Sequence, residues 1–266
     1  MPPEAVVAKL DHVFVPVADP APLFELFTGP LGLPVAWPIH DYGMFRSGGV
    51  CLGNANIEFV AGDPSLMPFF GPTEPLTVRG IAFEPAEGMT SETLDERGLR
   101  HTVPFPFEGK GHQHDGRLWT NVFLPGMVGV AAVAFTCEWH AEESLRGDRA
   151  RNALSERAGG ALGVRRLAEV TLGFVDLDTA RERWRRLLAP AEPDRHGAFR
   201  LGDGPAIRLK GAPLEGVAGT WLEVESLDRA RDALSSMDML GPMRASGIGL
   251  DYAKTGGLDV WLTEPR

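Results

Sequence analysis

Cysteine is scarce in this sequence, whose 266 residues include two, Cys51 and Cys137. Two cysteines cannot build a disulfide framework, and without a CxxC pair they form no zinc-binding cysteine motif. No apolar run approaches the roughly 20 residues that cross a bilayer. The opening Met-Pro-Pro-Glu lacks the basic and then apolar stretch of a secretion signal. We therefore expect a reduced, soluble protein of the cytoplasm.

Basic residues are also in deficit. The chain has 26 lysines and arginines against 36 aspartates and glutamates, which gives a formal net charge of -10. Nucleic acids and anionic lipids favour a basic surface, so this balance argues against both as partners. A small molecule is the partner that we expect. The sequence fits a monomer and a homodimer equally well.

Glycine and proline are frequent, with 32 and 22 residues, and they separate short apolar runs. This pattern predicts many short strands joined by turns. The first unit is expected to run strand, helix, strand, strand, strand, over 10–17, 19–29, 35–37, 43–46 and 56–60. A similar order recurs from residue 167, and two weaker copies begin at 78 and 220.

The chain thus divides into four βαβββ units, grouped in two pairs. The stretch 141–164 between the pairs is charge-rich and is expected to form an exposed helical linker. We predict one domain over 1–140 and a second over 165–266. The mixture of strands and helices places the fold in the α+β class.

The residues that carry a family resemblance are Leu10-Asp11-His12-Val13, Leu31-Gly32-Leu33-Pro34 and Gly53-Asn54-Ala55-Asn56-Ile57-Glu58-Phe59. With the order of the four units, they resemble the vicinal oxygen chelate superfamily, which includes glyoxalase I, bleomycin-resistance proteins and extradiol dioxygenases. The resemblance implies two glyoxalase-like domains, in which paired units curl into open, cup-shaped mixed sheets. It also implies that metal ligands on the first and last strands of the units point into the cup.

On this resemblance, His12 and Glu58 are the expected ligands of a divalent metal ion. Imidazole and carboxylate suit Fe, Mn, Ni or Zn. The family often places another histidine on the first strand of the partner unit, but the stretch 78–83 has none. Glu138 is therefore the candidate third ligand and a catalytic candidate. From the residues alone, His12 could instead bond to backbone, and Glu58 could face solvent.

The later pair of units departs further from the pattern. Glu169 aligns with His12, Arg208 aligns with Glu58, and Trp261 stands where the fourth unit would carry a carboxylate. We therefore expect no metal in the second domain. Its role would be packing or the covering of a pocket.

A glycine-rich loop joins two expected strands and contains His112 and His114. Alternation in an extended segment would aim both imidazoles the same way. The simpler interpretation is a solvated polar loop. The alternative is a lid that brings a histidine over the cup as a general acid or base, which makes His112 and His114 catalytic candidates.

Three functions remain open at this stage. The leading hypothesis is a metal-dependent enzyme whose substrate chelates the metal through vicinal oxygens, acting as a lyase or isomerase through a metal-bound enolate in preference to an oxygenase. The second is a metal-free protein that binds or sequesters a small molecule, such as a drug, in an apolar cup. A purely structural or regulatory role is the third, and no feature of the sequence favours it.

Overall fold

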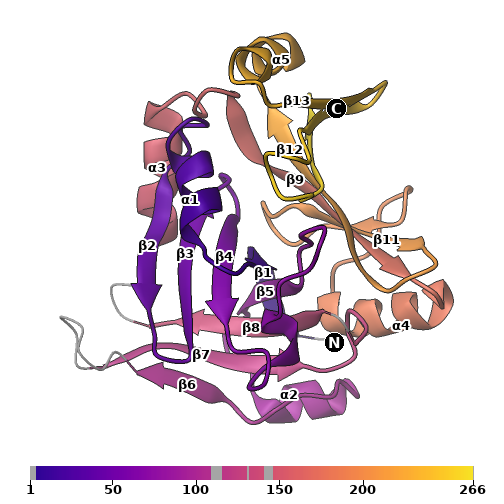
Figure 1. Ribbon diagram of the computed structural model, residues 1–266. Coiled ribbons are helices and arrows are strands. Elements are labelled where there is room, and N and C mark those ends of the chain that lie inside the picture. Colours follow the sequence, from indigo (N-terminus) through magenta and orange to yellow (C-terminus); the bar gives the residue numbers. More distant parts are fainter. Residues whose placement is uncertain (1–3, 109–115, 131, 141–145, 266) are drawn as a thin grey trace.

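The computed structural model describes residues 4–108, 116–130, 132–140 and 146–265. Its strands form two mixed sheets, one of eight strands and one of seven, which lie side by side in Figure 1. Each sheet is curled, and the helices lie outside the sheets (Figure 1). The α+β class and the two cup-shaped sheets predicted from the sequence are confirmed.

The first sheet has the order β2-β3-β4-β1-β5-β8-β7-β6. Its strands are β1 (Val7–Pro16), β2 (Val35–Asp41), β3 (Phe45–Cys51), β4 (Asn56–Gly62), β5 (Gly80–Pro85), β6 (Phe105–Glu108), β7 (Arg117–Leu124) and β8 (Val133–Trp139). Two units of four strands meet at the antiparallel β1–β5 pair, where His12 lies opposite Ala82. Within each unit the first and last strands run parallel, β1 with β4 and β5 with β8.

The second sheet has the order β10-β11-β9-β12-β15-β14-β13. Its strands are β9 (Val164–Phe174), β10 (Ala198–Phe199), β11 (Ala206–Gly211), β12 (Gly216–Val224), β13 (Leu240–Arg244), β14 (Gly247–Leu250) and β15 (Val260–Thr263). The arrangement repeats that of the first sheet, with β9 and β12 as the antiparallel centre. The described third unit has two strands after its helix where the other units have three.

The helices are α1 (Ala21–Thr28), α2 (Ser91–Glu96), α3 (Arg146–Glu156), α4 (Leu177–Leu188) and α5 (Leu227–Ser236), with a 3-10 turn η1 (Pro68–Phe70). Side-chain oxygens cap several of them, because the first N–H groups of a helix have no partner within it. Asp176 accepts from the backbone N–H of Thr179, and Ser226 accepts from that of Arg229. None of the described helices is long and apolar enough to cross a membrane.

One apolar core runs through both sheets. It includes Val13 and Val15 of β1 together with Leu167 and Val170 of β9. Trp184 of α4 reaches the first half of the chain, where its Nε1–H donates to the Met127 carbonyl at 3.0 Å. The two halves therefore share buried surface. This shared core explains why they stay together.

The stretch predicted as an exposed linker contains α3, which is anchored to the rest of the protein. Ala150 and Leu154 are 3% and 4% exposed, because one face of α3 is buried. Figure 1 shows α3 beside β2 and α1 at the edge of the first sheet. This part of the stretch is thus a helix with one buried face and is not fully exposed.

Candidate active site in the first sheet

The concave face of the first sheet holds a largely aromatic cluster that is separate from the main core. We call the cavity that this cluster lines the first cup. Strand alternation builds it, because every second residue of a strand points to the same face. Two alternating pairs point into the cup, Phe45 and Ser47 on β3 and Trp119 and Asn121 on β7. The remaining lining residues are His12, Phe14, Trp37, Tyr42, Glu58, Val60, Met67, Phe69, Phe70, Phe107, Phe123, Phe135, Cys137 and Trp139.

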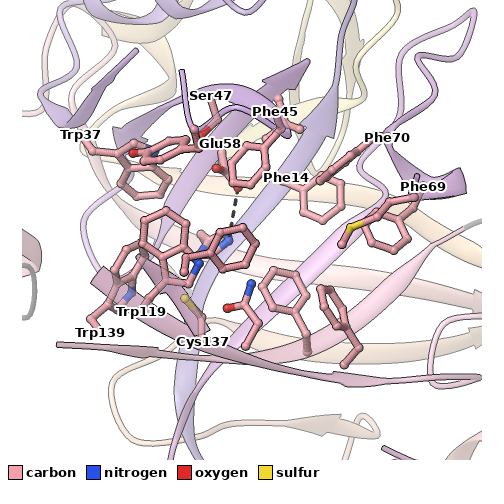
Figure 2. Close-up of a pocket in the computed structure, with 18 residues that line it drawn as sticks. Phe14, Trp37, Phe45, Ser47, Glu58, Phe69, Phe70, Trp119, Cys137 and Trp139 are labelled. Atoms are coloured by element: carbon pink, nitrogen blue, oxygen red, sulfur yellow. Dashed lines mark ion pairs between the residues drawn. The ribbon is translucent and has the colours of Figure 1, made fainter. Parts of the chain in front are cut away.

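His12 and Glu58 meet inside this cup. Figure 2 shows Glu58 among the aromatic rings that line it. His12 Nε2 lies 3.4 Å from Glu58 Oε2, across the parallel β1–β4 pair. The His12 side chain is nearly buried, and its ring lies edge-on to Trp37 and Phe135. The predicted convergence of an imidazole and a carboxylate in one concavity is therefore present in the geometry. Whether these two groups bind a metal stays a prediction.

A carboxylate not identified in the sequence holds the other side of the imidazole. Asp11 Oδ2 lies 2.6 Å from His12 Nδ1 and also accepts from Trp139 Nε1–H at 3.0 Å. Asp11 would alternate away from His12 in a regular strand. A β-bulge places it otherwise, because Leu10 and His12 face consecutive residues of β5 and leave Asp11 unmatched. Bulges commonly re-aim a side chain next to a functional site.

The polar neighbours of Asp11 extend to its far side. Glu84 on β5 is partly buried there, and burial is the main reason that its pKa lies above the ordinary value. The nearby Asp11 charge raises the Glu84 pKa further, while Lys9, 3.1 Å away, opposes the shift. Asp11 and the charged groups near it thus lie on the Nδ1 side of the imidazole, whereas Glu58 lies on its Nε2 side.

Two further polar groups inside the cup have no hydrogen-bond partner among the described residues. They are the hydroxyl of Ser47 and the amide oxygen of Asn121, both buried. A buried polar atom without a partner costs roughly 1–3 kcal/mol. Both atoms line the cavity beside His12 and Glu58. They are therefore positioned to bond to a molecule inside it.

The second unit does not repeat the His12–Glu58 pair. Strand pairing aligns the two units, since Phe14 lies opposite Glu58 and Ala82 lies opposite Phe135. Phe135 is therefore the counterpart of Glu58. Two residues before Ala82, Gly80 is the counterpart of His12, and a Cβ atom there would lie 1.7 Å from the Phe14 ring. An aromatic ring fills the space that a histidine would need.

The third ligand expected from the sequence is therefore not at the site. Glu138 is exposed and lies between Cys137 and Trp139, which both line the cup, so alternation points it to the opposite face. The described residues contain no group of three histidine, cysteine or acidic side chains that could hold a metal. They supply two ligands of a facial triad and do not fit the complete set. His112 and His114 lie outside the described residues.

The second sheet carries different side chains at the equivalent positions. We call the cavity that they line the second cup. Glu169 and Arg208, aligned with His12 and Glu58, form a two-pronged ion pair with N–O distances of 2.9 and 2.8 Å. A bulge also recurs, at Ala168, the counterpart of Asp11. Trp221 is the strand partner of Glu169, and its ring stacks on that of Trp261 with centroids 5.4 Å apart. The predicted replacement of the ligand pair thus creates a salt bridge.

Comparison with solved structures supports the architecture. The chain resembles an extradiol ring-cleaving dioxygenase from B. fuscum, with a TM-score of 0.61 and 13% identity over 100% of this chain and 74% of that one. A variant of homoprotocatechuate 2,3-dioxygenase from Brevibacterium fuscum has the same score and identity, over 100% and 73%. A hypothetical protein from Staphylococcus aureus has a TM-score of 0.60 and 11% identity, over 97% and 99%.

By sequence, no known family model and no curated protein matches the chain. At these low identities, the similarity to the solved structures establishes the fold alone. The chain therefore has the fold of vicinal oxygen chelate proteins.

Sequence reasoning missed most of the cup wall. Trp119 and Trp139 pair across β7 and β8, and Trp37 joins them from β2, far away in the sequence. The centroid of Trp139 lies 5.9 Å from that of Trp37 and 5.2 Å from that of Trp119. Phe69 and Phe107 also line the cup. The available signal was the alternation along 135–139, where Thr136 and Glu138 separate apolar residues that line the cup.

Proposed function

We propose that the first cup binds a small organic molecule with a flat apolar body and one polar end, and that His12 moves a proton at that end. The observation that carries this proposal is a buried imidazole between two carboxylates at the polar end of an aromatic cavity. Ligand sites of this kind use apolar walls for affinity and a few polar groups for orientation.

Asp11 sets the role of the imidazole. Its carboxylate accepts from Nδ1–H at 2.6 Å, which directs Nε2 toward Glu58 and the cavity. A histidine held in this way takes or returns a proton at Nε2, and the neighbouring Glu58 stabilises the imidazolium that forms. Proton transfer at a carbon or oxygen of the ligand belongs to isomerase or lyase chemistry.

Ser47 and Asn121 would fix the orientation of the ligand. The Ser47 hydroxyl can donate or accept, and the Asn121 amide oxygen accepts. A ligand with an N–H or O–H group would satisfy both, and water would be displaced from the aromatic walls. The neighbours named as ring-cleaving dioxygenases are consistent with a ring-shaped ligand.

A second candidate function is the metal-dependent enzyme expected from the sequence. The observation that favours it is the carboxylate on Nδ1, since metal-ligating histidines commonly donate their other N–H to such a group. His12 and Glu58 would hold the divalent ion, which would polarise an oxygen of the substrate. The incomplete set of described ligands makes this the weaker candidate.

Binding of phenol tests the first proposal, with cyclohexanol and benzylamine as matched probes. We expect phenol to bind most tightly and to shift the NMR signals of the His12 ring. His12→Asn should weaken phenol binding at least tenfold, while His196→Asn, at an exposed histidine outside the first cup, should leave it unchanged. Equal binding to the His12 variant would overturn the proposal.

Elemental analysis separates the two candidates. The purified protein, reconstituted with Fe, Mn, Ni and Zn in turn and then desalted, is compared with His12→Ala. The metal-free proposal expects less than stoichiometric metal in both. Stoichiometric metal that is lost in His12→Ala would favour the second candidate.

A further inference from the structure

The second cup contains a cavity that is wider than that of the first cup. Its volume is about 650 Å³, against about 50 Å³ for the first cup. Residues of β9, β11, β12 and β15 form its floor, and the segment around 194–200 forms part of its rim. The site proposed above does not use this cavity.

The carboxylates of the second cup are all engaged. Glu169 is paired with Arg208, and Glu223 is paired with Arg166 at 2.8 Å. Asp259 accepts from the Tyr252 hydroxyl and from Trp261 Nε1–H, both at 2.7 Å. The other two acids, Asp194 and Glu264, accept from backbone N–H groups. Each of the five acids thus has at least one donor, and two of them, Glu169 and Glu223, are paired with an arginine.

Several cations of the same cup have no such partner. Arg200, Lys210 and Arg244 line the cavity, and none forms an ion pair with a carboxylate of the described residues. The lining of the second cup has six arginines and lysines and five carboxylates, an excess of one positive charge, whereas the protein as a whole has a formal charge of -10. Cations that line a cavity without an ion-pair partner can pair with an anionic ligand.

The floor of the cavity is an indole surface. The rings of Trp221 and Trp261 are stacked, with an interplanar angle of 28°. The guanidinium of Arg244 lies 4.0 Å from the centre of the Trp261 ring. The Trp221 Nε1–H donates no hydrogen bond within the described part of the chain, so it remains available as a donor.

We propose that the second cup is a binding site for a small planar organic anion, such as an aromatic carboxylate. Trp221 would stack on the ring of the ligand and donate its N–H, while Arg244 and Lys210 would pair with the negative group. The Glu169–Arg208 pair would hold the floor in shape. This site is separate from the first cup, so either proposal can fail without the other.

Benzoate is the probe for this site, and the indole N–H signals of the ¹⁵N-labelled full chain are the readout. Trp221→Phe identifies the Trp221 signal. We expect benzoate to shift that signal while the signals of Trp37, Trp119 and Trp139 stay in place. Arg244→Gln and Lys210→Gln should each weaken benzoate binding at least fivefold.

Arg157→Gln is the matched control, because it removes the same charge from an exposed position outside the cup. It should bind benzoate as the wild type does. Thermal unfolding of every variant shows whether weaker binding reflects lost stability. The proposal is overturned if benzoate leaves the Trp221 signal unmoved, if Arg244→Gln behaves like Arg157→Gln, or if inorganic phosphate or benzylamine binds as tightly as benzoate.

Discussion

The two cups share one backbone plan and differ in chemistry. In the first, His12 and Glu58 face aromatic rings around a small cavity. In the second, Glu169 and Arg208 neutralise one another beneath a wide cavity with stacked indoles. The first strand of each sheet even keeps a β-bulge, at Asp11 in β1 and at Ala168 in β9. The fold therefore fixes where the side chains project, and the side chains decide what each cup can bind.

Paired glycine substitutions should show the largest difference between the cups. Gly80→Ala places a Cβ atom 1.7 Å from the Phe14 ring, whereas at Gly219 the nearest atom would be 3.6 Å away. Overpacking of this kind costs about 1–3 kcal/mol, and we expect Gly80→Ala near the upper end. Gly219→Ala should change stability little. Chemical denaturation measures both, and equal losses would contradict the assigned packing.

The two central pairs should respond differently to the loss of one member. Arg208→Met leaves the half-buried Glu169 without its main partner, which should cost about 1–2 kcal/mol. Glu58→Gln should change the free energy of unfolding less and reduce phenol binding more. Denaturation curves and phenol titrations of both variants test this contrast. It fails if Glu58→Gln is the more destabilising of the two.

The pH dependence of stability should give the smallest difference. Burial raises the pKa of Glu84, so the folded state keeps this proton longer, and stability falls as pH rises above about 4.3 through the folded pKa. The N–H of Ala198 lowers the pKa of Asp194, so its contribution is present above about 3.9 and is lost as pH falls through the folded pKa.

Melting temperatures between pH 2 and pH 7 test these opposite signs. Glu84→Gln should flatten the profile above about pH 4.3, and Asp194→Asn should flatten it below about pH 3.9. Profiles that keep the wild-type slope in both variants would show that other groups set the pH dependence.

Local sequence pattern was sufficient to predict the repeated units and the meeting of His12 with Glu58. The aligned stretches around His12 and Glu58 predicted that these side chains meet, and the parallel β1–β4 pair brings them together. Glu138 was misplaced because a shift of one residue along a strand reverses the face that a side chain occupies. The pairing of Ala82 with Phe135 sets that register, and it depends on contacts between strands far apart in the sequence.

The sequence by itself determined the repeated order of strands and helices, because turns and apolar periodicity are local properties. It also determined that the later units carry Glu169 and Arg208 in place of His12 and Glu58. Tertiary structure alone decided that Asp11 turns toward His12, that Trp37 meets Trp119 and Trp139 in one wall, and that Arg244 lies over the Trp261 ring. Each of these depends on a bulge, a register or the curl of a sheet, which arise only when separate strands pair.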